Sequence, residues 1–195
     1  MYEIAAKAIT NKFVRCGIIN SERQDVYNYG FELMISYLVY FIIFSCISLL
    51  TSTLVESYFF FIGFMFVRKF AGGIHAKTYI RCHILFELNH LLFIAVYHYC
   101  SYSTHLWIVL LIELFSIVVI WVLAPVDNSN KRLTINEKRH FKKMSRVYTV
   151  FIGGTIVAAI VVPGIEQYVF SYSVGVCSAS LSLLLAYFQE KFGVN

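Results

Sequence analysis

Apolar residues gather in six long stretches of the chain, separated by polar, glycine-bearing or basic segments. The stretches are Tyr27–Leu50, Leu54–Val67, Tyr79–Cys100, Leu106–Ala124, Tyr148–Val162 and Tyr168–Phe188. A helix needs about 20 predominantly apolar residues to cross a bilayer, within a range of about 17–25. Two of the stretches are short and are expected to extend into their flanks. The pattern predicts one transmembrane domain over residues 1–195, with a six-helix membrane bundle at 27–188.

Residues 1–22 show a different periodicity, typical of an amphipathic helix. As a helix, the segment places most of its charged side chains away from an apolar face, which holds Tyr2, Ala5, Ala6, Ile9, Phe13 and Cys16. Such a helix is expected to lie in the membrane interface; the alternative is a cap packed on the bundle. No cleavable signal peptide is expected, because the segment lacks a basic start followed by an apolar run and a cleavage site.

Composition supports a membrane protein. The chain is 59% apolar and 14% charged, with a mean hydropathy of +0.70, whereas soluble domains carry about 25% charged residues. Its 18 Phe and 14 Tyr suit a lipid-facing surface and interfacial belts. The expected fold class is an all-α integral membrane protein. Nucleic acid is not an expected partner, because the positive charge is that of a membrane protein's inner loops.

The 16 lysines and arginines indicate an orientation. Fifteen of them fall before the first stretch, between the second and third, between the fourth and fifth, or after the sixth, and Arg81 lies at the start of the third stretch. Cytoplasmic loops carry the excess of Lys and Arg in membrane proteins. Both termini and both basic loops are therefore expected in the cytoplasm.

The longest polar interruption in the first half of the chain is Arg68–Cys82. On one continuous helix His75 and Cys82 would lie about 10.5 Å apart along the axis. A general base must come within about 2.6–3.2 Å of its partner. Gly72-Gly73 favours a loop, and Thr78 is a suitable N-cap for the helix that follows. His75 is therefore expected on the loop and Cys82 in the first helical turn.

This position favours a reactive thiol. A helix N-terminus carries about half a positive charge, and Arg68, Lys77 and Arg81 are close in sequence. Such surroundings lower a cysteine pKa below its free value of about 8.5, and free backbone N–H groups in the turn can steady an oxyanion. A Cys–His pair with such donors suits acyl transfer by covalent catalysis. The residues alone leave open the alternative of a buried cysteine and an ordinary loop histidine.

The other cysteines and histidines indicate neither a disulfide framework nor a metal site. The five cysteines are odd in number and show no Cys-x-x-Cys pair. The histidines show no His-Glu-x-x-His spacing, so no metal and no cofactor are expected. Glu87 shares a helical face with His83 and His90, which predicts a hydrogen-bonded stripe between helices.

The segment Arg68–Cys82 resembles the signature of the accessory gene regulator B (AgrB) family, which are membrane peptidases of bacterial peptide quorum sensing. The shared pattern is a basic pair, a small-residue turn, His-Ala, and a cysteine seven residues after the histidine. A second segment, from Ala124-Pro125 through a polar, basic run to Lys131-Arg132, is similar to the family's stretch after its fourth span. Relatives often have proline where this chain has Arg132.

The resemblance implies a cysteine endopeptidase that removes the C-terminal tail of an AgrD-like precursor peptide and promotes its cyclisation to a thiolactone or lactone. Cys82 would be the nucleophile and His75 the general base and acid. The implied substrate-binding residues are Arg68, Lys69, Gly72, Gly73, Lys131 and Arg132. The expected partners are a precursor with an acidic tail, membrane lipids and a second copy in a homodimer. The expected location is the bacterial plasma membrane, with the site at the cytoplasmic face.

Glu32 is a third candidate catalytic residue, because an ionisable residue within a span is a functional candidate. It is expected to orient His75 or to contact substrate; the alternative is an interfacial carboxylate paired with a basic residue. The loop from Lys131 to Arg146 is expected to attract anionic headgroups and to steer an acidic tail. Two other functions stay open. One is a small transporter or exporter of a peptide or ion, with Glu87 and Glu113 lining a path, and the other is a structural membrane subunit.

Overall fold

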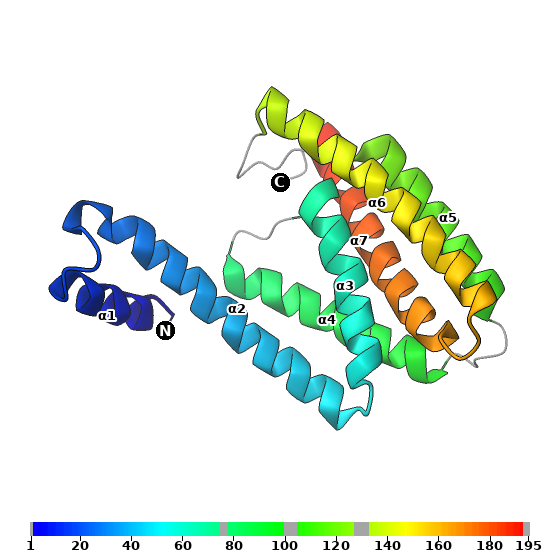
Figure 1. The fold of residues 1–195 in the computed structure, drawn as a ribbon, viewed down its shortest axis with the longest axis horizontal. Helices are drawn as coiled ribbons and strands as arrows, with labels where there is room; N and C mark the ends of the chain where they lie inside the picture. Colours follow the sequence, from blue (N-terminus) through cyan, green and yellow to red (C-terminus); the bar gives the residue numbers. More distant parts are fainter. Residues whose placement is uncertain (1, 75–77, 100–104, 127–132, 193–195) are drawn as a thin grey trace. The chain divides into compact units, whose positions relative to one another are not determined.

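The structure is a computed structural model that describes residues 2–74, 78–99, 105–126 and 133–192 (Figure 1). Within these ranges every regular element is helical, which confirms the all-α class. The chain forms two compact units, Met1–Ser52 and Thr53–Asn195. The elements are α1 (Tyr2–Arg15), the 3₁₀ turn η1 (Ser21–Arg23), α2 (Gln24–Leu50), α3 (Leu54–Ala71), α4 (Tyr79–Tyr99), α5 (His105–Leu123), α6 (Ile135–Val161) and α7 (Glu166–Phe192).

The first unit is a helical hairpin in which α1 packs along the start of α2. Phe13 stacks on Phe31 with ring centroids 5.7 Å apart. Gln24 Nε2 donates a hydrogen bond to Asn11 Oδ1 at 2.8 Å, and Ala6 is buried. The helix expected within residues 1–22 is therefore present, and part of its apolar face packs on α2. Its location in the membrane interface remains a prediction.

The second unit is built around α7. In the most apolar window of α7 61% of the residues are buried, against 28% in those of α4 and α6. Where α3 crosses α7, a Cβ at Gly63 would clash with the carbonyl oxygen of Tyr172, and one at Gly175 with that of Phe60. Small residues let two helix backbones approach closely in a membrane. Figure 1 shows α7 between α3 and the α5–α6 pair.

Polar side chains inside the second unit pair across helices. The Glu113 carboxylate of α5 accepts hydrogen bonds from Ser173 of α7 and, at 3.0 Å, from Thr155 Oγ1 of α6. Tyr172 Oη donates to Tyr148 Oη at 2.7 Å. Buried polar groups need such partners, because an unpaired group costs free energy in apolar surroundings. Glu113 therefore helps to hold α5, α6 and α7 together.

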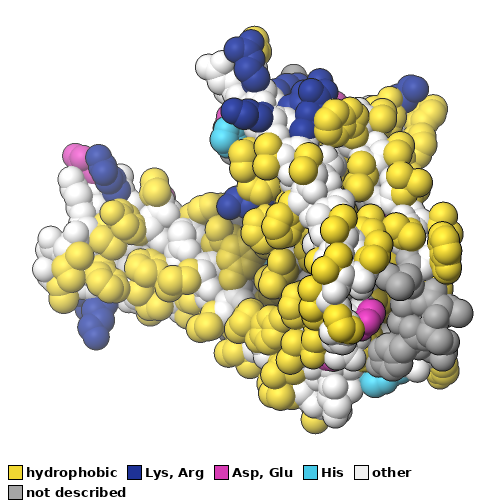
Figure 2. Space-filling view, turned by 45° about the vertical axis from the view of Figure 1, so that its right-hand side comes forward, with side chains coloured by type: hydrophobic (Ala, Val, Ile, Leu, Met, Phe, Trp, Pro, Cys, Tyr) yellow, Lys and Arg dark blue, Asp and Glu magenta, His cyan; other side chains and the backbone are white. Residues whose placement is uncertain are grey.

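Apolar side chains dominate the surface as well as the core. Figure 2 shows them over most of the visible face, with Lys and Arg side chains gathered at the upper end of the second unit. Four helices in the described residues are long and apolar enough to cross a membrane, Ser21–Leu50, Ile80–Tyr99, Ile135–Val161 and Glu166–Phe192, and Trp107–Leu123 is a shorter apolar helix. The 18-residue helix α3 carries three charged residues, Glu56, Arg68 and Lys69. The chain is a helical membrane protein, whereas six spans and cytoplasmic termini remain predictions.

One segment differs from its expected structure. The basic run to Arg146 was expected to be a loop, with a helix only from Tyr148, but α6 begins at Ile135. Thr134 Oγ1 accepts the N–H of Glu137 at 3.3 Å, and the Glu137 carboxylate accepts the N–H of Thr134 at 2.8 Å. This capping box satisfies two N-terminal donors and starts the helix early. Most of the basic side chains therefore project from about three helical turns.

Candidate functional site

Cys82 lies in the first turn of α4, where the sequence placed it. Thr78 Oγ1 accepts the N–H of Arg81 at 3.3 Å, and the N–H of Cys82 donates to the Thr78 carbonyl oxygen at 3.1 Å. These are the bonds of an N-cap residue. Cys82 is a free, half-buried cysteine, so the residue is partly exposed at the start of the helix.

The same bonds reduce the set of oxyanion donors that was expected in this turn. The backbone N–H groups of Arg81 and Cys82 both have acceptors. A helix leaves its first four N–H groups without intrahelical partners. An oxyanion at this turn would therefore have to use the earlier amides, those of Tyr79 and Ile80.

The turn that follows α3 is held by a serine of α7. Arg68 Nη1 donates to Ser182 Oγ at 3.2 Å, and the N–H of Ile74 donates to the same oxygen at 3.3 Å. Gly72 and Gly73 have φ of 93° and 140°, a region that favours glycine because it has no Cβ. A Cβ at Gly73 would clash with the Arg68 guanidinium. The glycine pair thus lets the backbone turn tightly around Arg68.

The turn is also fixed to the segment that follows α5. The N–H of Val126 donates to the Ala71 carbonyl oxygen at 3.1 Å, and a Cβ at Gly72 would lie 2.8 Å from the Val126 carbonyl oxygen. Ala124, which precedes a cis proline, is buried beside them. The two segments that carry the resemblance, the glycine turn and the Ala-Pro stretch, therefore lie against each other in the fold.

Arg68 supplies the nearby positive charge of this region. The guanidinium lies close enough to Cys82 for a negative charge on the thiol to interact with it favourably. Arg68 is half-buried, and Coulomb interactions strengthen where water is partly excluded. The region therefore combines a half-buried cysteine, a held cation and a glycine turn.

Several predicted site residues lie outside this cluster or outside the described residues. His75, Lys131 and Arg132 belong to the segments 75–77 and 127–132, which the structure does not describe. The pairing of His75 with Cys82 therefore remains a prediction. Lys69 is exposed, and its ammonium lies 5.5 Å from the centroid of the Phe70 ring.

Glu32 belongs to the first unit, whereas Cys82 belongs to the second. Glu32 is half-buried on α2. The pKa of Lys7 on α1 is raised chiefly by its hydrogen bond and ion pair with Glu3, and Asp25 and Glu32 contribute further negative charge. Glu32 thus lies within electrostatic range of Lys7, and its role toward His75 remains a prediction.

A second polar cluster joins α3 and α4. His90 Nε2 lies 3.0 Å from Ser57 Oγ, and its Nδ1 lies 3.3 Å from Glu87 Oε2. Thr53 Oγ1 lies 3.2 Å from the same serine oxygen. Ser57 and His90 are fully buried. The hydrogen-bonded stripe that was expected for His83, Glu87 and His90 is confirmed for Glu87 and His90, and Ser57 is the partner on the other helix.

Sequence reasoning missed Ser182 and the basic face of α6. Ser182 is 114 residues from Arg68, and no motif links the two. For α6 a signal was present, because Thr134 and Glu137 have capping-box spacing. A helix from that point places four basic residues at i, i+3, i+4 and i+7, which are Arg139, Lys142, Lys143 and Arg146.

The fold and the site define a helical membrane protein with a cysteine beside a basic glycine turn. Comparison with known families gives a match to accessory gene regulator B over residues 6–189. The chain belongs to this AgrB family, which takes part in quorum-sensing peptide processing and is related to AgrD-type precursor peptides. The family resemblance noted in the segment Arg68–Cys82 is therefore confirmed.

Two relatives from Clostridium perfringens extend the comparison. An AgrB-like protein of strain SM101 / Type A is 26% identical over 159 residues, which cover 78% of this chain and 74% of the relative. AgrB-like protein 2 of strain 13 / Type A is 24% identical over 159 residues, with the same coverage of 78% and 74%. No solved structure matches significantly.

Proposed function

We propose that this protein is a membrane-embedded cysteine endopeptidase with Cys82 as its nucleophile and His75 as its general base and acid. The observation that carries the proposal is the partly exposed Cys82 in a capped helical turn within electrostatic range of Arg68, which Ser182 holds in place. Membership in the AgrB family supplies the substrate class, an AgrD-type precursor peptide. The enzyme removes the C-terminal tail of the precursor and promotes cyclisation of what remains.

In the first step His75 takes the Cys82 proton, and the thiolate attacks the carbonyl carbon at the cleavage site. The C–N bond breaks, His75 protonates the leaving amine, and the tail departs. The precursor's acyl group then rests on Cys82 Sγ as a thioester. Arg68 stabilises the thiolate before the attack, because a nearby cation favours the negative sulfur.

In the second step an internal thiol or hydroxyl of the precursor attacks the thioester carbonyl. His75 accepts the proton of that group, and Cys82 leaves as a thiolate. When the attacking group is a thiol, one thioester replaces another, so the exchange is nearly isoenergetic. Positioning of the internal nucleophile and exclusion of water then decide cyclisation against hydrolysis.

Other predicted residues have supporting roles in the proposal. Glu32 orients His75, and precursor contacts come from the two basic pairs and the glycine turn, which are Arg68, Lys69, Gly72, Gly73, Lys131 and Arg132. Basic side chains suit an acidic tail, because complementary charge steers association. Six spans with cytoplasmic termini would place the site at the inner face of the bacterial plasma membrane, and the working unit is a homodimer.

Capture of the thioester tests the proposal. The protein in lipid vesicles is mixed with precursor, quenched in acid and weighed by intact mass spectrometry. The expected adduct has the mass of the precursor without its tail, maps to Cys82 and is removed by hydroxylamine. Cys177→Ala, which removes a half-buried cysteine of α7, is the matched control and keeps the adduct. Tail removal that persists in Cys82→Ala, or an adduct that maps elsewhere, contradicts the proposal.

A further inference from the structure

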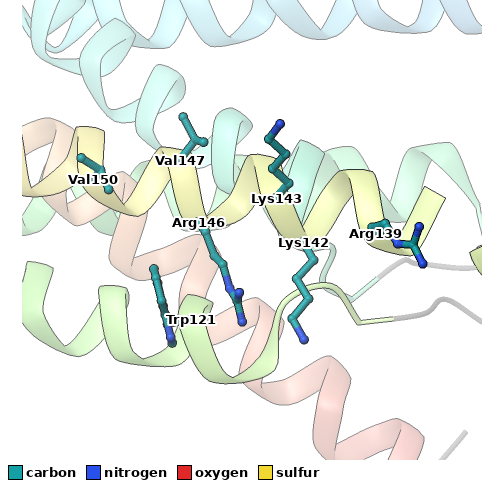
Figure 3. A pocket seen from close by; sticks show the side chains of 7 residues that line it. All are labelled: Trp121, Arg139, Lys142, Lys143, Arg146, Val147 and Val150. Carbon is teal, nitrogen blue, oxygen red and sulfur yellow. The ribbon is translucent and has the colours of Figure 1, made fainter. Parts of the chain in front are cut away.

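An open groove of about 470 Å³ lies between α5 and α6. Trp121 of α5 lines one side, and the basic residues of α6 line the other. In Figure 3, Lys142 and Arg146 extend from α6 toward α5, where Trp121 lies. The groove shares no lining residue with the Cys82 site, so the proposed enzyme chemistry does not account for it.

The groove concentrates positive charge. Four of its lining residues are basic, Arg139, Lys142, Lys143 and Arg146, and their spacing places them on adjacent turns of α6. Within the described part of the chain, none of the four forms an ion pair with a carboxylate. Like charges held together repel one another, and a bound anion relieves the repulsion. The groove is therefore suited to an anionic ligand.

The groove also passes from a polar to an apolar environment. After Arg146 the remainder of α6 contains no Asp, Glu, Lys or Arg. Val147 and Val150 line this end of the groove, and they are 56% and 74% exposed. The Arg146 guanidinium lies 4.9 Å from the Trp121 ring centroid. Trp at the membrane–water boundary and a snorkelling Arg are typical of the level where a helix enters hydrocarbon.

We propose that this groove binds an anionic phospholipid of the surrounding bilayer, with its phosphate among the basic side chains and an acyl chain along Val147 and Val150. Basic pockets between transmembrane helices bind anionic lipid headgroups. Charge alone would also suit an acidic peptide. A lipid is favoured because it covers the exposed valines with hydrocarbon, whereas an acidic tail leaves them uncovered.

Trp121 is a built-in reporter for this site. The chain has two tryptophans, so Trp107→Phe leaves Trp121 as the sole indole. The protein is placed in vesicles of equal parts phosphatidylglycerol and phosphatidylcholine, with bromine on the acyl chains of one lipid or the other. Bromine quenches a neighbouring indole. Brominated phosphatidylglycerol is expected to quench Trp121 at least about twofold more than brominated phosphatidylcholine. Equal quenching by the two brominated lipids overturns the proposal, and this comparison needs no substitution in the groove.

A groove variant and a matched control locate the preference. Combined Arg139→Gln, Lys142→Gln and Lys143→Gln substitutions remove three charges and keep Arg146 over Trp121, so the difference between the two lipids is expected to vanish. The control removes one arginine and two lysines from α1 through Arg15→Gln, Lys7→Gln and Lys12→Gln. It is expected to keep the difference in quenching between the two lipids. If the groove variant keeps the preference, the groove charges do not cause it, and the proposal fails. If both variants lose the preference, the total charge of the protein explains it, and the proposal fails as well.

A peptide occupant is tested in the same preparation. A soluble peptide with an acidic tail is added to the Trp107→Phe protein in the mixed vesicles. Because the proposal places lipid in the groove, the peptide is expected to leave quenching by brominated phosphatidylglycerol unchanged. If the peptide restores Trp121 emission at micromolar concentration, the groove is a peptide site and the lipid proposal fails.

Discussion

The helices α3 and α4 carry two polar clusters, one near the start of α3 and one near the start of α4. In the first, Ser57, His90 and Glu87 form a continuous chain of hydrogen bonds. Their residue types and their order are those of a serine hydrolase triad. In the second, Cys82 lies near Arg68, and its expected base belongs to a segment outside the described residues. By bonding pattern alone, the first cluster resembles an active site more closely than the second.

Accessibility reverses that ranking. Ser57 and His90 are 0% exposed, whereas a reacting carbonyl must come within about 3–3.5 Å of its nucleophile. Thr53 also contacts the Ser57 oxygen, so packing surrounds the hydroxyl. Cys82 is half-buried in a capped turn beside a cation. The difference shows that a chain of hydrogen bonds between buried residues joins helices, and that a reaction centre also needs access.

The largest expected effect comes from removing each nucleophile in turn. Cys82→Ala is expected to lower tail release by at least about 1,000-fold, because the attacking atom is lost. For Ser57→Ala, the rate of tail release per folded molecule is expected to stay within about threefold of the unsubstituted protein, because Ser57 cannot reach substrate. Mass spectrometry of the released tail, normalised to monodisperse protein, measures both. The opposite result, with cleavage lost only in Ser57→Ala, would assign the active site to the buried cluster.

The position of Cys82 at the start of a helix could largely be predicted from the local sequence. The apolar stretches marked the helices, the cap at Thr78 set the start of α4, and the Arg68–Cys82 pattern identified the family. The contact of Ser182 with Arg68 was not predictable, because it depends on how α7 packs. The start of α6 was predictable from the capping-box spacing of Thr134 and Glu137, a signal that hydropathy alone does not contain.

The next effect concerns stability. His90→Ala is expected to lower the free energy of unfolding by about 2–4 kcal/mol, because it leaves a cavity and deprives buried Ser57 of its imidazole partner. The His90 ring also stacks on Phe60 at 6.2 Å between centroids. Unfolding in mixed micelles measures the loss. His98→Ala, an exposed histidine on the same helix, is the control and should change stability by at most about 0.5 kcal/mol. Equal effects would mean that the cluster does not clamp the helices.

A smaller effect is expected where α7 holds the glycine turn. Ser182→Ala removes the acceptor of Arg68 and Ile74, so the guanidinium loses its fixed position near Cys82. Alkylation of Cys82 by a neutral reagent at constant pH is expected to slow about tenfold, because the glycine turn and the nearby cation lose their common hydrogen-bond acceptor. Ser178→Ala is the control: it removes a hydroxyl of α7 that donates to Asn89 at 2.7 Å, and it should leave alkylation unchanged. If both variants slow alkylation equally, Ser182 supports α7 rather than the site.

The smallest effect should come from the cap of α4. Thr78→Ala removes the acceptor of the Arg81 N–H, which costs about 1 kcal/mol at a helix start. The first turn then frays, the helix end offers less positive potential to Cys82, and alkylation is expected to slow about threefold. Thr78→Ser restores the rate, because a serine oxygen can accept the same bond. Thr134 caps α6 over the same 3.3 Å distance, so Thr134→Ala is a matched control that removes one cap hydrogen bond from another helix. It should not change the alkylation rate of Cys82. If Cys82 is alkylated more slowly in both variants, the rate reports a loss of stability in the whole helical unit. The cap of α4 would then have no special role in presenting the thiol.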